Sequence, residues 1–247
     1  METKISIDEI LNLSFQRWKE NLGFLVGLTV IYFLTVFIAS IIVGGILQFV
    51  FSFLYPSSSE FSVFSANNLS STKILISFLV QLILQAVIIV FHLGFLKSLI
   101  KISKGEEAKI SDIFSCFPLF LKAFALYFLL NLILIPAFLF FIIPGIILSA
   151  RLGFSYLFLL EEKIDPIEAL KRSFKATDRN TLRIILLFFL AGIISAIGAF
   201  AFFIGMIFTF PFSSLMLVST YLRYLKKEEI DQQEEKAPQG SLESQEK

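Results

Sequence analysis

Residues 117–183 read FPLFLKAFALYFLLNLILIPAFLFFIIPGIILSARLGFSYLFLLEEKIDPIEALKRSFKATDRNTLR and decide the fold. Two almost unbroken apolar runs, 119–143 and 146–160, meet at Pro144-Gly145, and the composition then changes to a basic amphipathic segment. A helix needs about 20 apolar residues to cross the hydrocarbon core of a bilayer. The stretch therefore predicts a membrane hairpin hinged at Pro144 and Gly145, followed by a helix that lies on the membrane surface.

The composition of the whole chain also indicates a membrane protein. Of the 247 residues 56% are hydrophobic and 17% are charged, and the mean hydropathy is +0.82. Soluble domains carry about 25% charged residues, and a membrane barrel would alternate polar and apolar residues. We therefore expect an all-α, polytopic membrane protein. Nothing in its charge or its motifs favours a nucleic-acid partner.

Lysine and arginine gather in the polar segments on one side of six apolar runs. The runs cover residues 22–49, 73–99, 119–143, 146–160, 182–203 and 205–227. Apart from Lys73 and Arg151, every Lys and Arg lies at the N-terminus, in 97–122, in 161–183 or beyond residue 222. Positive charge accumulates in cytoplasmic loops. We predict six transmembrane helices in the cytoplasmic membrane, a multi-pass topology and both termini in the cytoplasm.

Residues 1–227 are predicted to form one six-span membrane domain that begins with an interfacial helix. Ser6 and Glu9 have the spacing of a capping box, and Trp18 is placed at headgroup level. Residues 228–247 carry seven acidic residues against two lysines and show no periodicity. Such a segment cannot bury enough apolar surface to order itself, so we expect a disordered acidic tail.

The cytoplasmic segments before the odd-numbered spans resemble one another. IDEILNLSFQRWKENL, from residue 7, aligns without gaps with PIEALKRSFKATDRNT, from residue 166, and a weaker copy starts at residue 110. This predicts amphipathic interfacial helices and a threefold internal repeat of a surface helix plus a two-span hairpin. Chance similarity between short amphipathic segments is the alternative.

Five strongly polar residues fall at membrane depth. They are Gln81, Gln85, His92, Asn131 and Arg151. Polar groups there are costly and usually face the bundle interior or a watery cavity. One reading is a polar track for a solute or a proton; the other, which we favour for the amides and His92, is interhelical hydrogen bonding. For Arg151 we expect a structural anchor or a contact with a lipid or anion. The expected partners are backbone carbonyls freed at the Pro144-Gly145 break, Asn131, Gln81, Gln85 or a lipid phosphate.

Small residues predict close helix packing in two places. Gly23 and Gly27 form a GxxxG pattern in the first span, and a ladder of small residues runs through the fifth span. The ladder consists of Ala191, Gly192, Ser195, Ala196, Gly198 and Ala199. We expect these residues to pack within the chain.

The sequence shows no metal spacing of Cys and His, no phosphate-binding loop and no nucleophile elbow. We therefore predict no catalytic, cofactor or metal residues, and a protein that is not an enzyme. The expected function is a scaffold, accessory or regulatory role; the alternative is a transporter or permease that uses the polar face of spans two to four. Expected partners are the bilayer and a membrane protein or second copy, with anionic headgroups near Lys171, Arg172 and Lys175.

The central block resembles a family of prokaryotic membrane proteins. The shared features are Pro144-Gly145, an Arg early in the next helix (Arg151), an acidic turn, and the EALKRS element that begins at Glu168. The block is similar to the membrane domain found beside glycerophosphoryl diester phosphodiesterases and to YciC-like proteins. The resemblance spans residues 1–226, with the specific part confined to the central forty residues. It implies a six-span bundle and a membrane location, and no activity.

Overall fold

The computed structural model describes residues 5–54, 71–200 and 204–225, and the regular elements in these ranges are all helical. The α-helices are α1 (Ile7–Glu20), α2 (Leu22–Leu54), α3 (Ser71–Lys104), α4 (Phe120–Phe140), α5 (Ile142–Leu152), α6 (Ser155–Glu162), α7 (Pro166–Ala176), α8 (Thr181–Phe200) and α9 (Ile204–Thr220). The shorter elements are the 3₁₀ helices η2 (Ile110–Phe114), η3 (Phe117–Leu119) and η4 (Asp178–Asn180), and the π-helical turn η5 (Tyr221–Leu225). The predicted acidic tail, 228–247, lies outside the described residues.

Five helical stretches of the described chain are long and apolar enough to cross a membrane. They are Leu22–Ile46, Ile110–Phe140, Ile142–Glu162, Asp178–Phe200 and Gly205–Leu225. Large apolar side chains on them face outward, for example Phe37, Leu139 and Phe189. Side chains of this size are normally buried in a soluble domain, so the expectation of an all-helical membrane protein is confirmed at this level.

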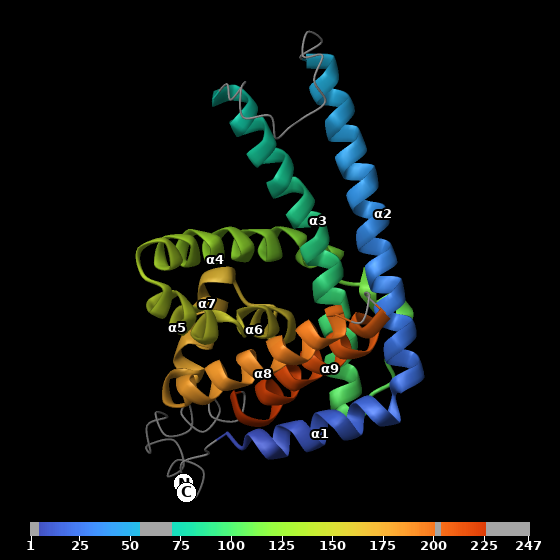
Figure 1. Cartoon of the computed structure of the whole chain (residues 1–247), viewed down its shortest axis with the longest axis vertical. Helices are drawn as coiled ribbons and strands as arrows, with labels where there is room; N and C mark the ends of the chain where they lie inside the picture. The colour runs from blue at the N-terminus through green and yellow to red at the C-terminus, as the bar shows by residue number, and fades with distance from the viewer. Residues whose placement is uncertain (1–4, 55–70, 201–203, 226–247) are drawn as a thin grey trace, which may run out of the picture.

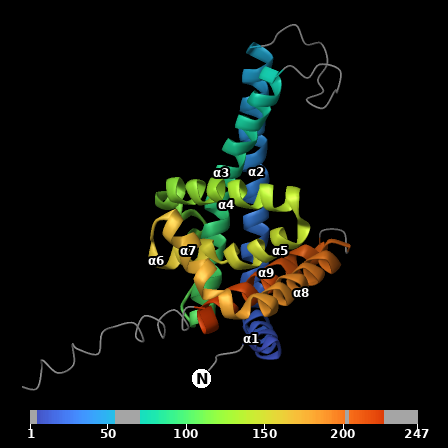
Figure 2. The ribbon, with the colours of Figure 1, turned by 90° about the vertical axis from the view of Figure 1, so that its left-hand side faces the viewer.

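The two longest helices, α2 and α3, form a pair that projects beyond the rest of the molecule (Figure 1). They contain 33 and 34 residues, so at ~1.5 Å per residue each is about 50 Å long. Figures 1 and 2 both show α4 running across this pair, with α8 and α9 inclined to it. The apolar helices therefore do not share one axis.

The helix is interrupted between α4 and α5 at Phe141, about one turn before the predicted hinge at Pro144 and Gly145. Phe141 has extended backbone angles, φ −152° and ψ 122°, whereas Pro144 and Gly145 lie in the first turn of α5. Pro144 has no N–H to donate to the carbonyl of Phe140, so an unbroken helix would lose a bond there. Gly145 lets α5 fold back onto α4, because a Cβ on it would lie 2.6 Å from the ring of Phe138.

The run 146–160, expected as part of one continuous span, is divided between α5 and α6. The helix ends at Leu152 and resumes at Ser155, and the Ser155 hydroxyl donates to the carbonyl of Leu152 at 2.6 Å. At Gly153 a Cβ would lie 2.6 Å from the ring of Phe188 on α8. The close approach of α8 thus requires glycine at the break.

Part of the small-residue ladder on α8 packs as predicted, whereas Gly192, Ala196 and Ala199 are exposed and the GxxxG pattern makes no close contact in the described structure. Ser195 donates to Ser213 of α9 at 3.0 Å, and a Cβ on Gly198 would overlap Thr209. In contrast, nothing lies within 4 Å of a Cβ built on Gly23 or Gly27. The α8–α9 pair is therefore held by direct backbone approach.

The four polar segments predicted to be cytoplasmic contact one another. Lys104 pairs with Glu161 at 2.7 Å, and Glu9 pairs with Arg223. Arg17 donates to the carbonyl of Ile102 at 3.1 Å, which joins the N-terminal segment to 97–122. Except for Arg151, the ion-paired residues of the described ranges all come from these segments. The remaining pairs are Lys101–Asp112, Lys122–Asp165, Arg172–Glu162 and Arg172–Glu168.

Two of the three segments aligned as repeats are amphipathic α-helices. In α1 the aligned Ser14 is buried and in α7 the aligned Ser173 is buried, while the Phe that follows each is exposed. The third segment, from residue 110, forms the 3₁₀ turns η2 and η3 instead.

Candidate functional site at the α5–α7 junction

Arg151, the charged residue singled out at membrane depth, lies in the last turn of α5. A cation there interacts favourably with the negative end of the helix dipole. Helix α5 has only 11 residues, so it ends where α7 and η4 pack against it. That placement brings Arg151 to the polar segment 161–183.

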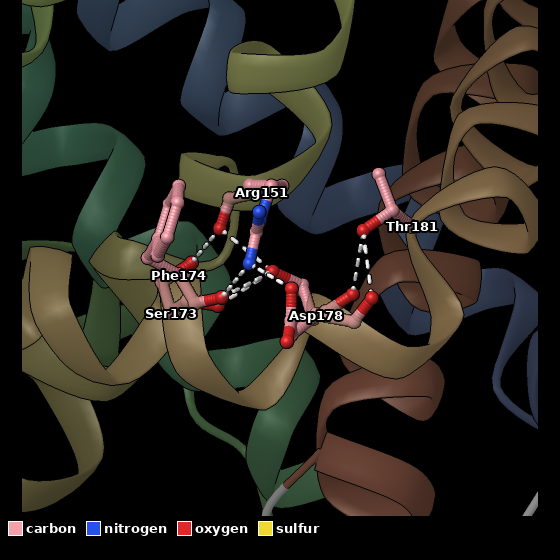
Figure 3. A network of polar contacts seen from close by, with 6 residues as sticks. Arg151, Ser173, Phe174, Asp178 and Thr181 are labelled. Atoms are coloured by element: carbon pink, nitrogen blue, oxygen red, sulfur yellow. Dashed lines mark hydrogen bonds and ion pairs between the residues drawn. The ribbon is translucent and has the colours of Figure 1, made fainter.

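The guanidinium group of Arg151 is held on three sides (Figure 3). Its carbon lies 3.5 Å from the centre of the Phe174 ring, and Nη2 donates to the Phe174 carbonyl at 3.2 Å. The same nitrogen forms an ion pair with the carboxylate of Asp178. Planar stacking and a fixed fork of donors are properties that Arg has and Lys lacks.

The backbone carbonyl of Arg151 is also used. The last carbonyls of a helix have no partner within the helix, and here Ser173 donates to that oxygen at 2.7 Å. The Thr177 hydroxyl lies 3.2 Å from the same oxygen, but its shortest hydrogen bond, at 2.7 Å, goes to the Ser173 carbonyl of its own helix. Thr181 donates to the carbonyls of Thr177 and Asp178 at 2.9 and 3.2 Å. Each hydroxyl of this network therefore donates to a main-chain oxygen and ties α5, α7, η4 and α8 together.

The network is built to hold helices in place. Its carboxylate, on Asp178, is 66% exposed, so the ion pair itself contributes only about 0–1 kcal/mol. A cation over an aromatic ring adds about 0.5–1 kcal/mol at such sites. The guanidinium does not give up a proton, and the hydroxyls contact carbonyl oxygens rather than a base. The Nε atom of Arg151 is buried and has no hydrogen-bond partner in the described structure.

The partners that Arg151 has in the structure differ from the expected ones. No hydrogen bond in the described residues joins it to Gln81, Gln85 or Asn131; Asn131 donates to the carbonyl of Tyr127 in its own helix at 2.8 Å. The carbonyl that it contacts belongs to Phe174 on α7 and not to the Pro144-Gly145 break, where a carbonyl partner was expected. The predicted spans contain no Asp or Glu. The acid that pairs with Arg151, Asp178, lies after α7, in a segment folded against the end of α5.

His92 belongs to a separate aromatic cluster between α2, α3 and α9. Its Nδ1 lies 3.4 Å from the hydroxyl of Tyr32, and the tautomer decides which of the two donates. The ring of Tyr32 stacks on Phe210 at 5.7 Å between centroids. No pattern in the sequence pointed to Tyr32 as the partner.

The two glutamines on α3 lie on its N-terminal half, where Gln81 is exposed and Gln85 half-buried. No hydrogen bond of the described residues connects them with His92, Asn131 or Arg151. The five polar residues singled out in the sequence thus occupy separate places in this structure.

The three basic residues proposed for headgroup contact divide into two kinds. Arg172 forms ion pairs with Glu162 and Glu168. Lys171 and Lys175 are exposed on α7, and no carboxylate of the described residues lies within ion-pair distance of either. Lys171 and Lys175 are therefore available to a membrane surface or a partner.

A comparison of the chain with protein-family models, curated proteins and solved structures found no match. The resemblance to the membrane domain found beside glycerophosphoryl diester phosphodiesterases stays a prediction that rests on the central block alone.

Proposed function

We propose that this protein is a non-catalytic integral membrane protein of the cytoplasmic membrane with a scaffold, accessory or regulatory role. In this proposal α3 also crosses the membrane, as the second of six spans, and both termini lie in the cytoplasm. The three successive units, each a short helical segment followed by two long stretches, are copies of one ancestral hairpin.

The observation that carries the proposal is the use of Arg151. A charge inside the apolar helices of a transporter commonly marks a pathway for an ion or a solute. Here the guanidinium is engaged by Phe174 and Asp178, and the backbone carbonyl of Arg151 accepts from Ser173. These contacts fix α7 on the end of α5. The polar side chains of this region therefore hold a surface helix in position.

The Arg151 network holds helix α7 at the surface of the molecule. It packs on α4, α5 and α6 through Ala169, Leu170 and Ser173, while Ile167 and Lys171 are exposed. An exposed apolar side chain beside unpaired lysines suits binding to a protein or a headgroup layer. We assign the partner-binding role to this face.

The topology draws its support from the contacts among polar segments. Two spans separate each such segment from the next, so six spans would bring all four to one side. Lys104–Glu161, Glu9–Arg223 and Arg17–Ile102 link segments in the way that this arrangement requires. Because α4, α8 and α9 are inclined to the α2–α3 pair, the membrane topology is the first property to test.

Site-specific photo-cross-linking in the native membrane tests the scaffold role. A photoreactive residue at Ile167 or Lys171 is expected to give one protein adduct of defined mass. The same residue at Phe189, an outward apolar position on α8, is the matched control and is expected to give lipid adducts only. Lipid adducts alone at all three positions would contradict a scaffold role.

The transport alternative is tested with purified protein in proteoliposomes. Permeability to protons, potassium and chloride is expected to equal that of empty vesicles. A flux that Arg151→Gln or His92→Ala abolishes, with the helical content unchanged, would replace the scaffold proposal with transport.

A further inference from the structure

A cavity of about 220 Å³ lies among the end of α3, the middle of α1 and the turn η5. It is lined by Leu13, Arg17, Ser103, Ser219, Leu222 and Arg223. This cavity is distinct from the Arg151 network and from the exposed lysines of α7. Helix α1 runs beneath the end of α3 (Figure 1).

The polar groups that line the cavity are all hydrogen-bond donors. Arg17 and Arg223 bring guanidinium groups, and Ser103 and Ser219 bring hydroxyls. Ser14 donates to the oxygen of Ser219 at 3.3 Å, so the Ser219 hydrogen is left to donate elsewhere. The buried Ser103 hydroxyl has no hydrogen-bond partner in the described structure. Convergent donors with no carboxylate among the lining residues suit an oxyanion.

The charge balance around the cavity is also positive. The carboxylate of Glu9 pairs with Arg223 and accepts from the Tyr224 hydroxyl at 2.5 Å. Arg17 donates to the carbonyl of Ile102, and no carboxylate of the described residues lies within ion-pair distance of it. A half-buried guanidinium without a carboxylate partner attracts an anion from its surroundings.

Two further features fit a ligand at headgroup depth. Trp18 stacks against Phe15 at 5.9 Å and donates its indole N–H to the Phe208 carbonyl at 3.1 Å. Tryptophan concentrates at the membrane–water interface, which puts the neighbouring Arg17 among the headgroups. Leu222 and Arg223 come from η5, and single π-helical turns are frequent at functional sites.

We propose that this cavity binds a phosphate group, with Arg17 and Arg223 on its oxygens and Ser103 and Ser219 donating to it. Arginine recognises phosphate with paired, parallel hydrogen bonds. A dry cavity of about 150 Å³ accommodates benzene, so this larger one has room for a phosphate and the first carbons attached to it. Leu13 and Leu222 form the apolar wall for those carbons. The phosphate comes from a lipid headgroup or from a soluble phosphate, and both sources place the same chemistry in the cavity.

The intrinsic fluorescence of the protein provides the readout, because Trp18, next to Arg17, is the only tryptophan. The full-length protein in phosphatidylcholine nanodiscs is compared with the protein in nanodiscs of rising phosphatidic acid content. A saturable change in Trp18 emission is expected. Inorganic phosphate added to the phosphatidylcholine nanodiscs forms the second arm: saturation in this arm too assigns a soluble phosphate, and saturation only with the lipid assigns a headgroup.

Ser103→Ala is the decisive variant, because its hydroxyl has no partner to lose and the fold should be unaffected. Half-saturation is expected to move up about tenfold, and Arg17→Gln is expected to raise it by about ten- to a hundredfold. Arg17→Lys keeps the charge and should recover only part of the affinity. Lys19→Gln removes a positive charge from an exposed position on α1 that does not line the cavity, and should leave half-saturation unchanged.

Three outcomes would overturn the proposal: a response that rises without saturating, a Ser103→Ala protein that binds as the wild type does, or equal losses in Arg17→Gln and Lys19→Gln. None of these outcomes bears on the protein partner of α7. Failure of this site and failure of the scaffold role are therefore distinguishable.

Discussion

The guanidinium carbon of Arg151 lies 3.5 Å from the centre of the Phe174 ring, and the carboxylate of Asp178 pairs with the guanidinium. Two short helices that are separate in sequence, α5 and α7, thus meet through one side chain. Because neither helix is long enough to be stable alone, the junction depends on such contacts.

Arg151→Gln is expected to lower the free energy of unfolding in detergent by about 1–3 kcal/mol, because hydrogen bonds to a charged group and the ring contact are lost together. Arg151→Lys retains the charge without the planar stacking and should cost about 1 kcal/mol. Thermal unfolding followed by circular dichroism measures both. Lys175→Gln, an exposed position on α7, is the control, and a loss equal to that of Arg151→Gln would contradict the anchoring role.

Gly198→Ala is expected to destabilise the α8–α9 pair by about 1–3 kcal/mol, as overpacking generally does. The new Cβ would lie 2.9 Å from the carbonyl oxygen of Gly205 and would overlap Thr209. Backbone atoms stand on the other side, so the strain cannot be relieved by rotating a side chain. Unfolding in detergent is again the measurement.

Gly192→Ala on the same helix is the matched control. Nothing lies within 4 Å of a Cβ at this position, and alanine favours a helix over glycine by about 0.5–1 kcal/mol. The variant is expected to be as stable as the wild type or slightly more stable. Opposite signs for these two substitutions would distinguish helix packing from helix propensity.

Helix content and membrane character were predictable because they depend on local composition. Long apolar runs recur in the sequence, and α2, α4, α8 and α9 follow them closely. Amphipathic spacing located α1 and α7, whose Ser14 and Ser173 are both buried. The relative directions of helices depend on which of their faces meet. The apolar runs of the sequence therefore did not predict that α4 is inclined to the α2–α3 pair.

The partners of polar residues were much harder to predict, because they depend on tertiary contacts. Ser6 caps α1 as expected, accepting from the N–H of Glu9 at 3.4 Å. The other half of the predicted capping box is missing: the Glu9 carboxylate binds Tyr224 and Arg223, more than two hundred positions away. The same limit explains why Asp178 was not foreseen as the partner of Arg151.

The contact of Glu9 with Tyr224 and Arg223 predicts a dependence of α1 docking on pH. The hydrogen bond from the Tyr224 hydroxyl holds the pKa of Glu9 below its usual 4.5, desolvation opposes this, and Arg223 lowers the pKa further. A carboxyl group with a depressed pKa stabilises the fold above its unfolded-state pKa and loses that effect as the pH falls through the folded-state value. Docking is thus expected to be constant above about pH 5 and to weaken in the acidic range below the usual value.

Trp18 emission reports this docking, since Trp18 contacts Phe212 of α9 at 6.1 Å between ring centroids. Glu9→Gln should remove the acidic transition, and Tyr224→Phe should shift it to higher pH. Asp8→Asn, an exposed acid beside Glu9, serves as the control and should leave the transition where it is. An unchanged transition in Glu9→Gln would assign it to another group.

Single cysteines should reveal the predicted topology in intact cells. Cys116 is buried and is the only cysteine, so Cys116→Ala gives a silent background. A cysteine at Ser58, between the first two apolar runs, is expected to react with an impermeant maleimide from outside. One at the exposed Glu107 should react only after the cells are opened, because 97–122 is a predicted cytoplasmic segment. Labelling of both positions from the same side would mean that α3 does not cross the bilayer, and the six-span arrangement would then be wrong.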